Sequence, residues 1–111
     1  MSDREKSVAK WPFSDLHGFK DFVGFVKLCA PAAFPLREGV SSAEQWSLDL
    51  AFQGLRDGLD LYVPRGRDGA RFANCIALAE HAYGEYQAGR RRDGFAALAD
   101  LQRIVKSIPS R

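Results

Sequence analysis

Apolar residues recur at steps of four and three along this chain, and this spacing limits its possible folds more than any other feature. The clearest series runs through Leu48, Phe52, Leu55, Leu59 and Tyr62. Such steps place side chains on one face of an α-helix, whereas a half-buried strand would alternate apolar and polar residues. Three further segments carry helical spacing and none shows sustained alternation. The sequence therefore predicts an all-α fold, a compact bundle of about four helices.

The first helix and the connection after it are marked by a cap and two prolines. The helix is predicted over about Ser14–Cys29, with Ser14 as its N-cap, because a serine hydroxyl accepts a hydrogen bond from a first-turn amide. Two neighbouring apolar stripes predict that this helix is deeply buried or lies between two others. Pro31 and Pro35 then favour an extended connection over Ala32–Val40, because proline disfavours helix at the residue before it.

The second helix is predicted to begin at Ser41 or Ser42. Glu44 and Gln45 follow these serines by three residues, so each pair fits a capping box. Pro64 ends the helix because proline has no amide hydrogen to continue it. Gly54 and Gly58 lie inside this helix one turn apart, and we expect another helix to cross closely there.

Two more helices are predicted over about Ala70–Ala88 and from about Asp93 to the residue before Pro109. Gly89 suits the position just past the end of the earlier helix, where a left-handed backbone is common. Asp93 suits the N-cap of the later one. The connection between them is short, so we expect an antiparallel hairpin.

This hairpin resembles one unit of the tetratricopeptide repeat, and the resemblance covers about 35 residues. The residues that carry it are Ala82, Tyr86, Gly89, Leu98 and Leu101. The spacing from the alanine to the turn glycine is longer than in that repeat, and Gly94 stands where an alanine is expected. A stable array needs about three copies and the chain holds one, so no function is carried over.

The length of 111 residues predicts a single helical domain over 1–111, in which 1–12 form a loosely packed N-terminal segment. The first ten residues lack the apolar core of a secretory signal, and no apolar stretch is long enough to span a membrane. Cys29 and Cys75 are too few for a disulfide framework. We therefore expect a cytoplasmic protein with reduced thiols.

Charge is nearly balanced overall but unevenly distributed. The 16 Lys and Arg against 14 Asp and Glu give +2, which argues against a strongly basic nucleic-acid binder and against an acidic solvating protein. Residues 41–63 carry four acids against one arginine, and residues 64–92 carry six arginines against three acids. An acidic surface attracts a basic partner, and arginine makes bidentate contacts with carboxylates and phosphates.

These segments supply the candidate partner-binding residues. They are Asp49, Arg56, Asp57, Asp60, Arg65, Arg67 and Arg71. The alternative is a solvated helix face for the acids and a solvated loop for the arginines. Arg90–Arg92 have a simpler explanation, because cations after a helix complement its dipole.

Two histidines are candidates for metal binding. His17 precedes Asp21 and His81 precedes Glu85 by four residues, so each pair lies on one helix face. On packed helices the two pairs would offer four metal ligands, whereas the alternative is two surface hydrogen bonds or ion pairs. No metalloprotease motif is present, and we predict neither a metal nor another cofactor.

Nucleophilic catalysis finds little support in the sequence. Cys29 and Cys75 both lie on helix flanks dominated by apolar residues, where the pKa of a thiol rises. Cys75 is the better candidate, because Arg71 precedes it by one helical turn. No nucleophile elbow, phosphate-binding loop or dinucleotide fingerprint is present. We therefore predict a protein that is not an enzyme.

A small protein-binding module is the function that these observations favour. Aromatic residues form 12% of the chain, and four of them lie outside the helical series as candidate exposed anchors: Trp11, Phe13, Phe34 and Trp46. Small cytoplasmic helical domains of this size and architecture resemble the immunity proteins that bacteria hold against their own secreted toxins. The resemblance implies an inhibitor that binds and neutralises a toxin or another enzyme.

Two alternatives remain open. A nucleic-acid-binding regulator would use the arginine-rich segments, although Glu80 and Glu85 on the third predicted helix would repel phosphate. Self-association is the other, because a symmetric dimer would cover apolar surface that four short helices leave exposed.

Overall fold

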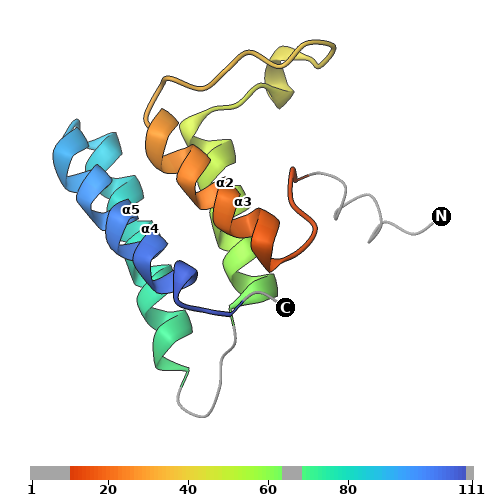
Figure 1. The fold of residues 1–111 in the computed structure, drawn as a ribbon. Helices are drawn as coiled ribbons and strands as arrows, with labels where there is room; N and C mark the ends of the chain where they lie inside the picture. The colour runs from red at the N-terminus through yellow and green to blue at the C-terminus, as the bar shows by residue number, and fades with distance from the viewer. Residues whose placement is uncertain (1–10, 64–68, 110–111) are drawn as a thin grey trace.

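A computed structural model describes residues 11–63 and 69–109 of the chain, so residues 1–10 of the predicted N-terminal segment lie outside it. The described residues form four α-helices and one 3-10 turn, and they contain no strand (Figure 1). The helices are α2 (Leu16–Cys29), α3 (Leu48–Tyr62), α4 (Ala70–Gln87) and α5 (Arg91–Lys106). The prediction of an all-α bundle of about four helices is confirmed.

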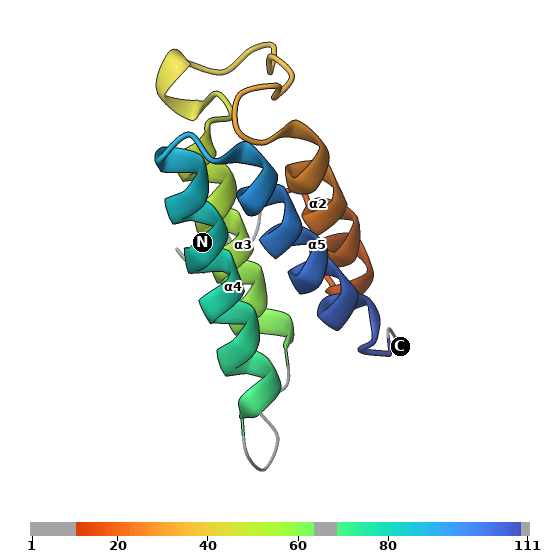
Figure 2. The same ribbon diagram turned by 90° about the vertical axis from the view of Figure 1, so that its left-hand side faces the viewer.

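Successive helices run in opposite directions and occupy the four corners of a bundle (Figures 1 and 2). α2 packs against α3 and α5, and α4 packs against the same two helices. α2 and α4 therefore lie at opposite corners, with the apolar core between all four helices. The predicted hairpin of the last two helices is confirmed, and α4 and α5 form the most extensive contact in the bundle.

α2 begins one residue later than a serine cap would place it. Asp15 is the N-cap, and its carboxylate accepts a hydrogen bond from the Gly18 amide at 2.8 Å. The prediction of Ser14 as the cap is therefore wrong. A carboxylate suits this position better than a hydroxyl, because its charge also complements the positive end of the helix dipole. The buried face of α2 carries Phe19, Phe22, Val23 and Val26.

The second helix begins later than predicted. Only a 3-10 turn, η1 (Ser42–Glu44), forms where a capping box was expected, and α3 is instead capped by Ser47, which accepts from the Leu50 amide at 3.1 Å. The reason lies in Gln45, whose side chain bonds the backbone amide and carbonyl of Arg37, each at 2.7 Å. The Gln45 side chain needed for a capping box thus joins the irregular connection at Arg37 to the end of the 3-10 turn.

Close packing between α2 and α3 depends on the two glycines of α3, as predicted. A Cβ atom on Gly54 would lie 2.9 Å from Cζ of Phe22, and a Cβ on Gly58 would overlap the ring of Phe19. Both rings are buried against the α3 backbone. Aromatic side chains of α2 therefore pack directly against the α3 backbone at two positions where α3 has no side chain.

The aromatic residues outside the helical series are not all available as anchors. Trp11 and Phe13 are buried in the core, so these two of the four candidates are not exposed anchors. Trp11 also donates a hydrogen bond from Nε1 to Asp57 of α3 at 3.0 Å. Phe34 and Trp46 are half-buried against the edge of the core. Aromatic packing thus extends from the bundle onto the segment that precedes α2.

The turn between α4 and α5 is tighter than predicted. Gly89 adopts a φ of 83°, and the Arg90 amide donates to a carbonyl of α4 at 2.8 Å, which closes the end of that helix. α5 then begins at Arg91, so Asp93 lies inside its first turn and the prediction of Asp93 as the N-cap is wrong. The first turn of α5 therefore carries arginines that were expected to precede the helix.

We predict opposite effects for two glycine-to-alanine substitutions. Gly58→Ala should lower the free energy of unfolding by about 2 kcal/mol or more, because the new methyl group overlaps Phe19. Gly84→Ala is the matched control in α4, where a Cβ meets nothing within 4 Å. It should raise the free energy of unfolding by about 0.5–1 kcal/mol through helix propensity alone. Urea unfolding followed by circular dichroism measures both, and equal effects would contradict the close approach.

Candidate functional site

The acidic residues predicted on α3 are partly engaged inside the molecule. Asp49 accepts a hydrogen bond from the hydroxyl of Tyr83 on α4, and this bond raises the pKa of Tyr83. Asp57 holds the indole of Trp11. Both carboxylates therefore tie α3 to its neighbours, whereas Arg56 and Asp60 lie on the exposed side of the helix.

The predicted partner-binding residues do not gather at one place. Arg65 and Arg67 lie outside the described residues. Arg71 is exposed in the first turn of α4, at the end of the bundle where Asp60 lies, whereas Asp49 lies at the opposite end. The set thus extends along the bundle, and its role in partner binding stays a prediction.

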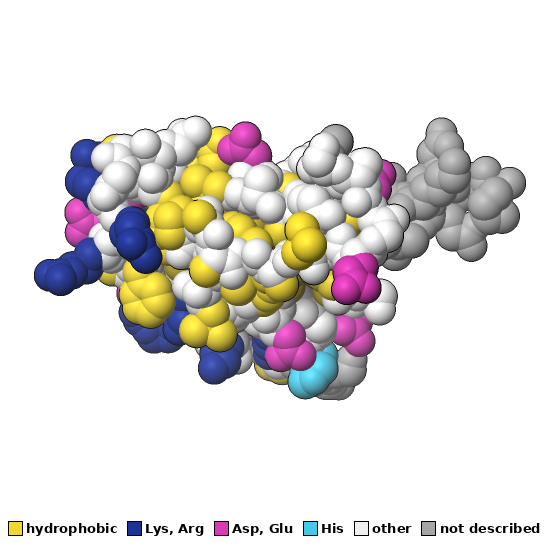
Figure 3. All heavy atoms as spheres, turned by 90° about the horizontal axis from the view of Figure 1, so that it is seen from above, with side chains coloured by type: hydrophobic (Ala, Val, Ile, Leu, Met, Phe, Trp, Pro, Cys, Tyr) yellow, Lys and Arg dark blue, Asp and Glu magenta, His cyan; other side chains and the backbone are white. Residues whose placement is uncertain are grey.

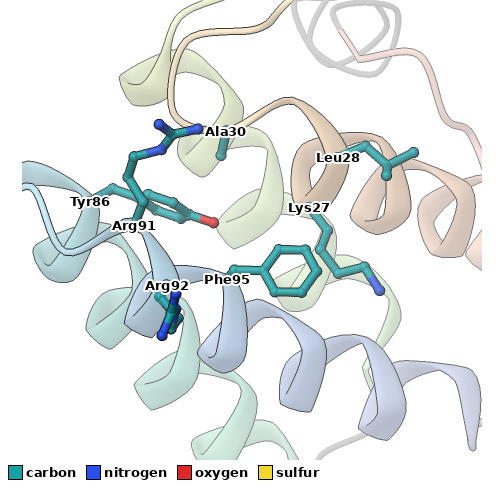
Figure 4. A pocket seen from close by; sticks show the side chains of 7 residues that line it. All are labelled: Lys27, Leu28, Ala30, Tyr86, Arg91, Arg92 and Phe95. Carbon is teal, nitrogen blue, oxygen red and sulfur yellow. The ribbon is translucent and has the colours of Figure 1, made fainter.

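A pocket of about 490 Å³ lies at the end of the bundle where α2 and α4 finish and α5 begins (Figure 4). Its walls come from three helices and the residue after α2. They are Lys27, Leu28 and Ala30, then Tyr86, then Arg91, Arg92 and Phe95. This volume lies within the range of ligand pockets, and none of these lining residues is acidic.

The apolar wall of this pocket is unusually open to solvent. Leu28 is 78% exposed and Phe95 is 47% exposed. The ammonium group of Lys27 lies 5.5 Å from the centre of the Phe95 ring and donates to Oε1 of Gln102 at 2.6 Å. Viewed from this end, hydrophobic side chains run across the middle of the surface and lysines and arginines gather along its left side (Figure 3).

The cationic wall conflicts with the dipole of α5. Arg91 and Arg92 occupy the first turn, where the positive end of the helix favours acidic residues. Within residues 11–63 and 69–109, neither of them forms a salt bridge, whereas Arg90 pairs with Glu85. Asp93 in the same turn offsets part of this cost, and an arrangement that lowers local stability is typical of a functional site.

The floor of the pocket carries a buried hydroxyl. Tyr86 is 6% exposed, and its hydroxyl finds no hydrogen-bond partner among the described residues. Burial raises the pKa of Tyr86, and the nearby guanidinium of Arg91 opposes this rise. The hydroxyl therefore stays protonated at neutral pH, and its oxygen points into the space between Ala30 and Phe95 (Figure 4).

A second, smaller pocket of about 250 Å³ lies on the outer side of α2. Its walls include Phe22, Phe25 and Trp46, with the carboxylate of Asp21 at the edge. The guanidinium of Arg37 stacks on Trp46 at 5.1 Å from the ring centre. This pocket is an extension of the aromatic packing between α2 and the connection, and it offers a ligand little polar chemistry.

The structure separates the two histidine pairs. His17 and Asp21 lie on α2, whereas His81 and Glu85 lie on α4 at the opposite corner of the bundle, with 3.5 Å between Nε2 and Oε2 of the latter pair. The four-ligand alternative is therefore wrong, and the described residues hold no group of three metal-ligating side chains.

The thiols are free and do not face each other across a site. Cys29 is half-buried at the end of α2, and Cys75 is buried in α4. Burial raises the pKa of Cys75 more than Arg71 lowers it. A thiolate is therefore scarce at neutral pH, and Cys75 does not have the environment of an activated nucleophile.

The sequence analysis missed the pocket because its residues come from separate helices. The three consecutive arginines Arg90–Arg92 are the sequence feature that points to this pocket. Their position after a predicted helix suggests a role at the end of α4, whereas Arg91 and Arg92 belong to the start of α5. Leu28 and Phe95 carried no signal, because single apolar residues at the edge of a helical series do not reveal whether a neighbour covers them.

Comparisons with protein-family models, with curated proteins and with solved structures find no match. No helix in the described part of the chain is both long and apolar enough to cross a membrane.

Replacing an arginine at the pocket with an acid should stabilise the chain. We expect Arg91→Glu to raise the melting temperature by roughly 2–5 °C, because a negative charge suits the amino end of α5. Lys106→Glu, in the last turn of the same helix, should lower it by a similar amount. Differential scanning calorimetry at low salt measures both melting temperatures. A lower melting temperature for Arg91→Glu would show that Arg91 already has a stabilising partner.

Proposed function

We propose that this chain is a non-enzymatic protein-binding module and that it binds its partner with the open end of the bundle. The observation that carries the proposal is that the exposed Leu28 and Phe95 lie beside Arg91 and Arg92, which form no salt bridge within residues 11–63 and 69–109. Aromatic residues and arginine dominate the residues that contribute most to protein–protein binding. Apolar side chains next to unpaired cations are therefore suited to a partner surface of complementary character.

The chemistry of this end favours an acidic partner surface with apolar side chains at its centre. Arg91 and Arg92 would steer such a surface toward the pocket, and Leu28 and Phe95 would be buried on contact. In its more specific form, the proposal is a cytoplasmic inhibitor that neutralises a toxin or another enzyme by covering it. This form rests on the size and architecture of the bundle.

Nucleic acid is the second candidate. The amino end of a helix with two arginines suits a phosphate group. Phosphate contacts would leave Leu28 and Phe95 in solvent, however, and exposed apolar side chains gain nothing from a hydrated backbone. We therefore place protein binding first.

Selection from a random peptide library on the full chain tests the proposal. We expect enriched peptides in which Asp or Glu stands beside Leu, Phe or Trp. A synthetic peptide of this kind should bind Phe95→Ala and the double variant Arg91→Glu/Arg92→Glu at least about tenfold more weakly. Leu61→Ala is the matched control, because Leu61 is 59% exposed near the other end of α3.

Three outcomes would contradict the proposal. The first is a selection without enrichment, and the second is enrichment that Phe95→Ala and the double variant leave unchanged. The third is binding of an oligonucleotide, steeply dependent on salt and lost in the double variant, without peptide binding. Sedimentation of the free chain belongs beside these measurements, because a dimer that Phe95→Ala dissociates would assign this surface to self-association.

A further inference from the structure

The buried hydroxyl of Tyr86 gives the open end of the bundle a more specific chemistry. We propose that the pocket is a carboxylate-binding site in which the Tyr86 hydroxyl, Arg91 and the amino end of α5 bind the carboxylate, while Leu28 and Phe95 contact an apolar group attached to it. The inference that a protein partner supplies this carboxylate rests on the proposed function. The chemistry of the pocket can be tested without a partner.

The position of the hydroxyl is fixed from two sides. The Tyr86 ring lies against Gly94 of α5 so closely that a Cβ atom there would be 2.8 Å from the ring. The other contact is with Phe52 of α3, at 6.2 Å between ring centres in an edge-on arrangement. The ring therefore cannot turn its hydroxyl to another acceptor, and the pocket is the place toward which it points (Figure 4).

The Tyr86 hydroxyl has no hydrogen-bond partner of either kind among the described residues, so its proton lacks an acceptor. A buried phenol that donates no hydrogen bond has lost its water without compensation. The neighbouring lining groups Lys27, Arg91 and Arg92 are all donors and cannot fill this need. An incoming group must therefore be an acceptor, and the nearby guanidinium of Arg91 favours one that is negatively charged.

The helix end adds a second reason for an anion. α2 and α3 have side-chain caps from Asp15 and Ser47, whereas Gly69 before α4 and Arg90 before α5 offer no side-chain acceptor to the first-turn amides. The positive end of the α5 dipole thus lies beside Arg91 and Arg92. A bound carboxylate would accept hydrogen bonds from the first-turn amides, the Arg91 guanidinium and the Tyr86 hydroxyl.

The apolar lining of the pocket favours a carboxylate that carries an apolar group over a small hydrated anion. Leu28, Ala30 and Phe95 form the apolar part of the lining, and the volume of about 490 Å³ is several times that of a carboxylate alone. An inorganic phosphate would leave this apolar part in water. A carboxylate on an aromatic or aliphatic group fills both parts, which makes an apolar carboxylic acid the ligand class.

Titration of the ¹⁵N-labelled chain with 4-phenylbutyrate tests the site directly. We expect saturable amide shifts confined to the start of α5 and the end of α2. 4-Phenylbutanol, which lacks the charge, and inorganic phosphate, which lacks the apolar group, should each bind at least about tenfold more weakly. Equal binding of the alcohol, or shifts spread over the whole surface, would overturn the proposal.

The variant Tyr86→Phe carries the sharpest expectation. It should weaken 4-phenylbutyrate binding by about tenfold or more, and it should raise the melting temperature of the free chain by about 4 °C, because it removes an uncompensated buried hydroxyl. Tyr83→Phe is the matched control, since that hydroxyl is bonded to Asp49 and Gln87. It should leave 4-phenylbutyrate binding unchanged and should not raise the melting temperature.

The outcomes separate this inference from the proposed function. A Tyr86→Phe variant that binds 4-phenylbutyrate as the natural chain does, or that melts at a lower temperature, would overturn the carboxylate site and leave peptide selection unaffected. Binding of 4-phenylbutyrate that needs Tyr86 would support the site even if no peptide were selected. Two short peptides, one with a free C-terminus after Phe and one amidated with an internal Glu before Phe, identify which carboxylate a protein partner supplies.

Discussion

The contact of Phe19 with the bare backbone at Gly58 is the interaction on which the rest of this structure depends. Because α3 has no Cβ atom there, the α2 ring fits against the helix backbone, and Phe22 repeats the arrangement at Gly54. Two close contacts one turn apart fix both the distance and the rotation of α2. The carboxyl end of α2 then lies beside the start of α5, where Lys27 and Leu28 form part of the pocket.

The same device fixes the other half of the pocket. Gly94 lets the ring of Tyr86 lie against the first turn of α5, so the α4–α5 hairpin also closes on an aromatic ring over a glycine. Here the consequence differs, because Phe19 is wholly apolar whereas Tyr86 ends in a hydroxyl. Packing that stabilises the hairpin therefore places a polar atom where no protein group within the described residues meets it.

The sequence predicted the helices better than their ends. Apolar spacing depends on one helix at a time, so four helices and the close crossing at Gly54 and Gly58 could be predicted. The start of α3 could not, because Gln45 fits a capping box locally but bonds the distant Arg37 backbone in the fold. The pocket had no single-segment signal, since it exists only where three helix ends meet. The exposure of Leu28 likewise depends on which other segments cover it in the folded chain.

Two features at the pocket lower the stability of the free chain, and a bound anionic acceptor would offset both. Arg91 and Arg92 at the start of α5 oppose the helix dipole, and the Tyr86 hydroxyl is buried without an acceptor in the described part of the chain. A group that binds only the folded chain raises the free energy of unfolding, and this rise grows with the logarithm of the ratio of its concentration to its dissociation constant. A carboxylate in this pocket would relieve both costs at once, so binding and folding stability are coupled there. An apolar ligand that only filled the pocket would also stabilise the folded chain by binding to it, but it would neither neutralise the arginines nor give the Tyr86 hydroxyl an acceptor.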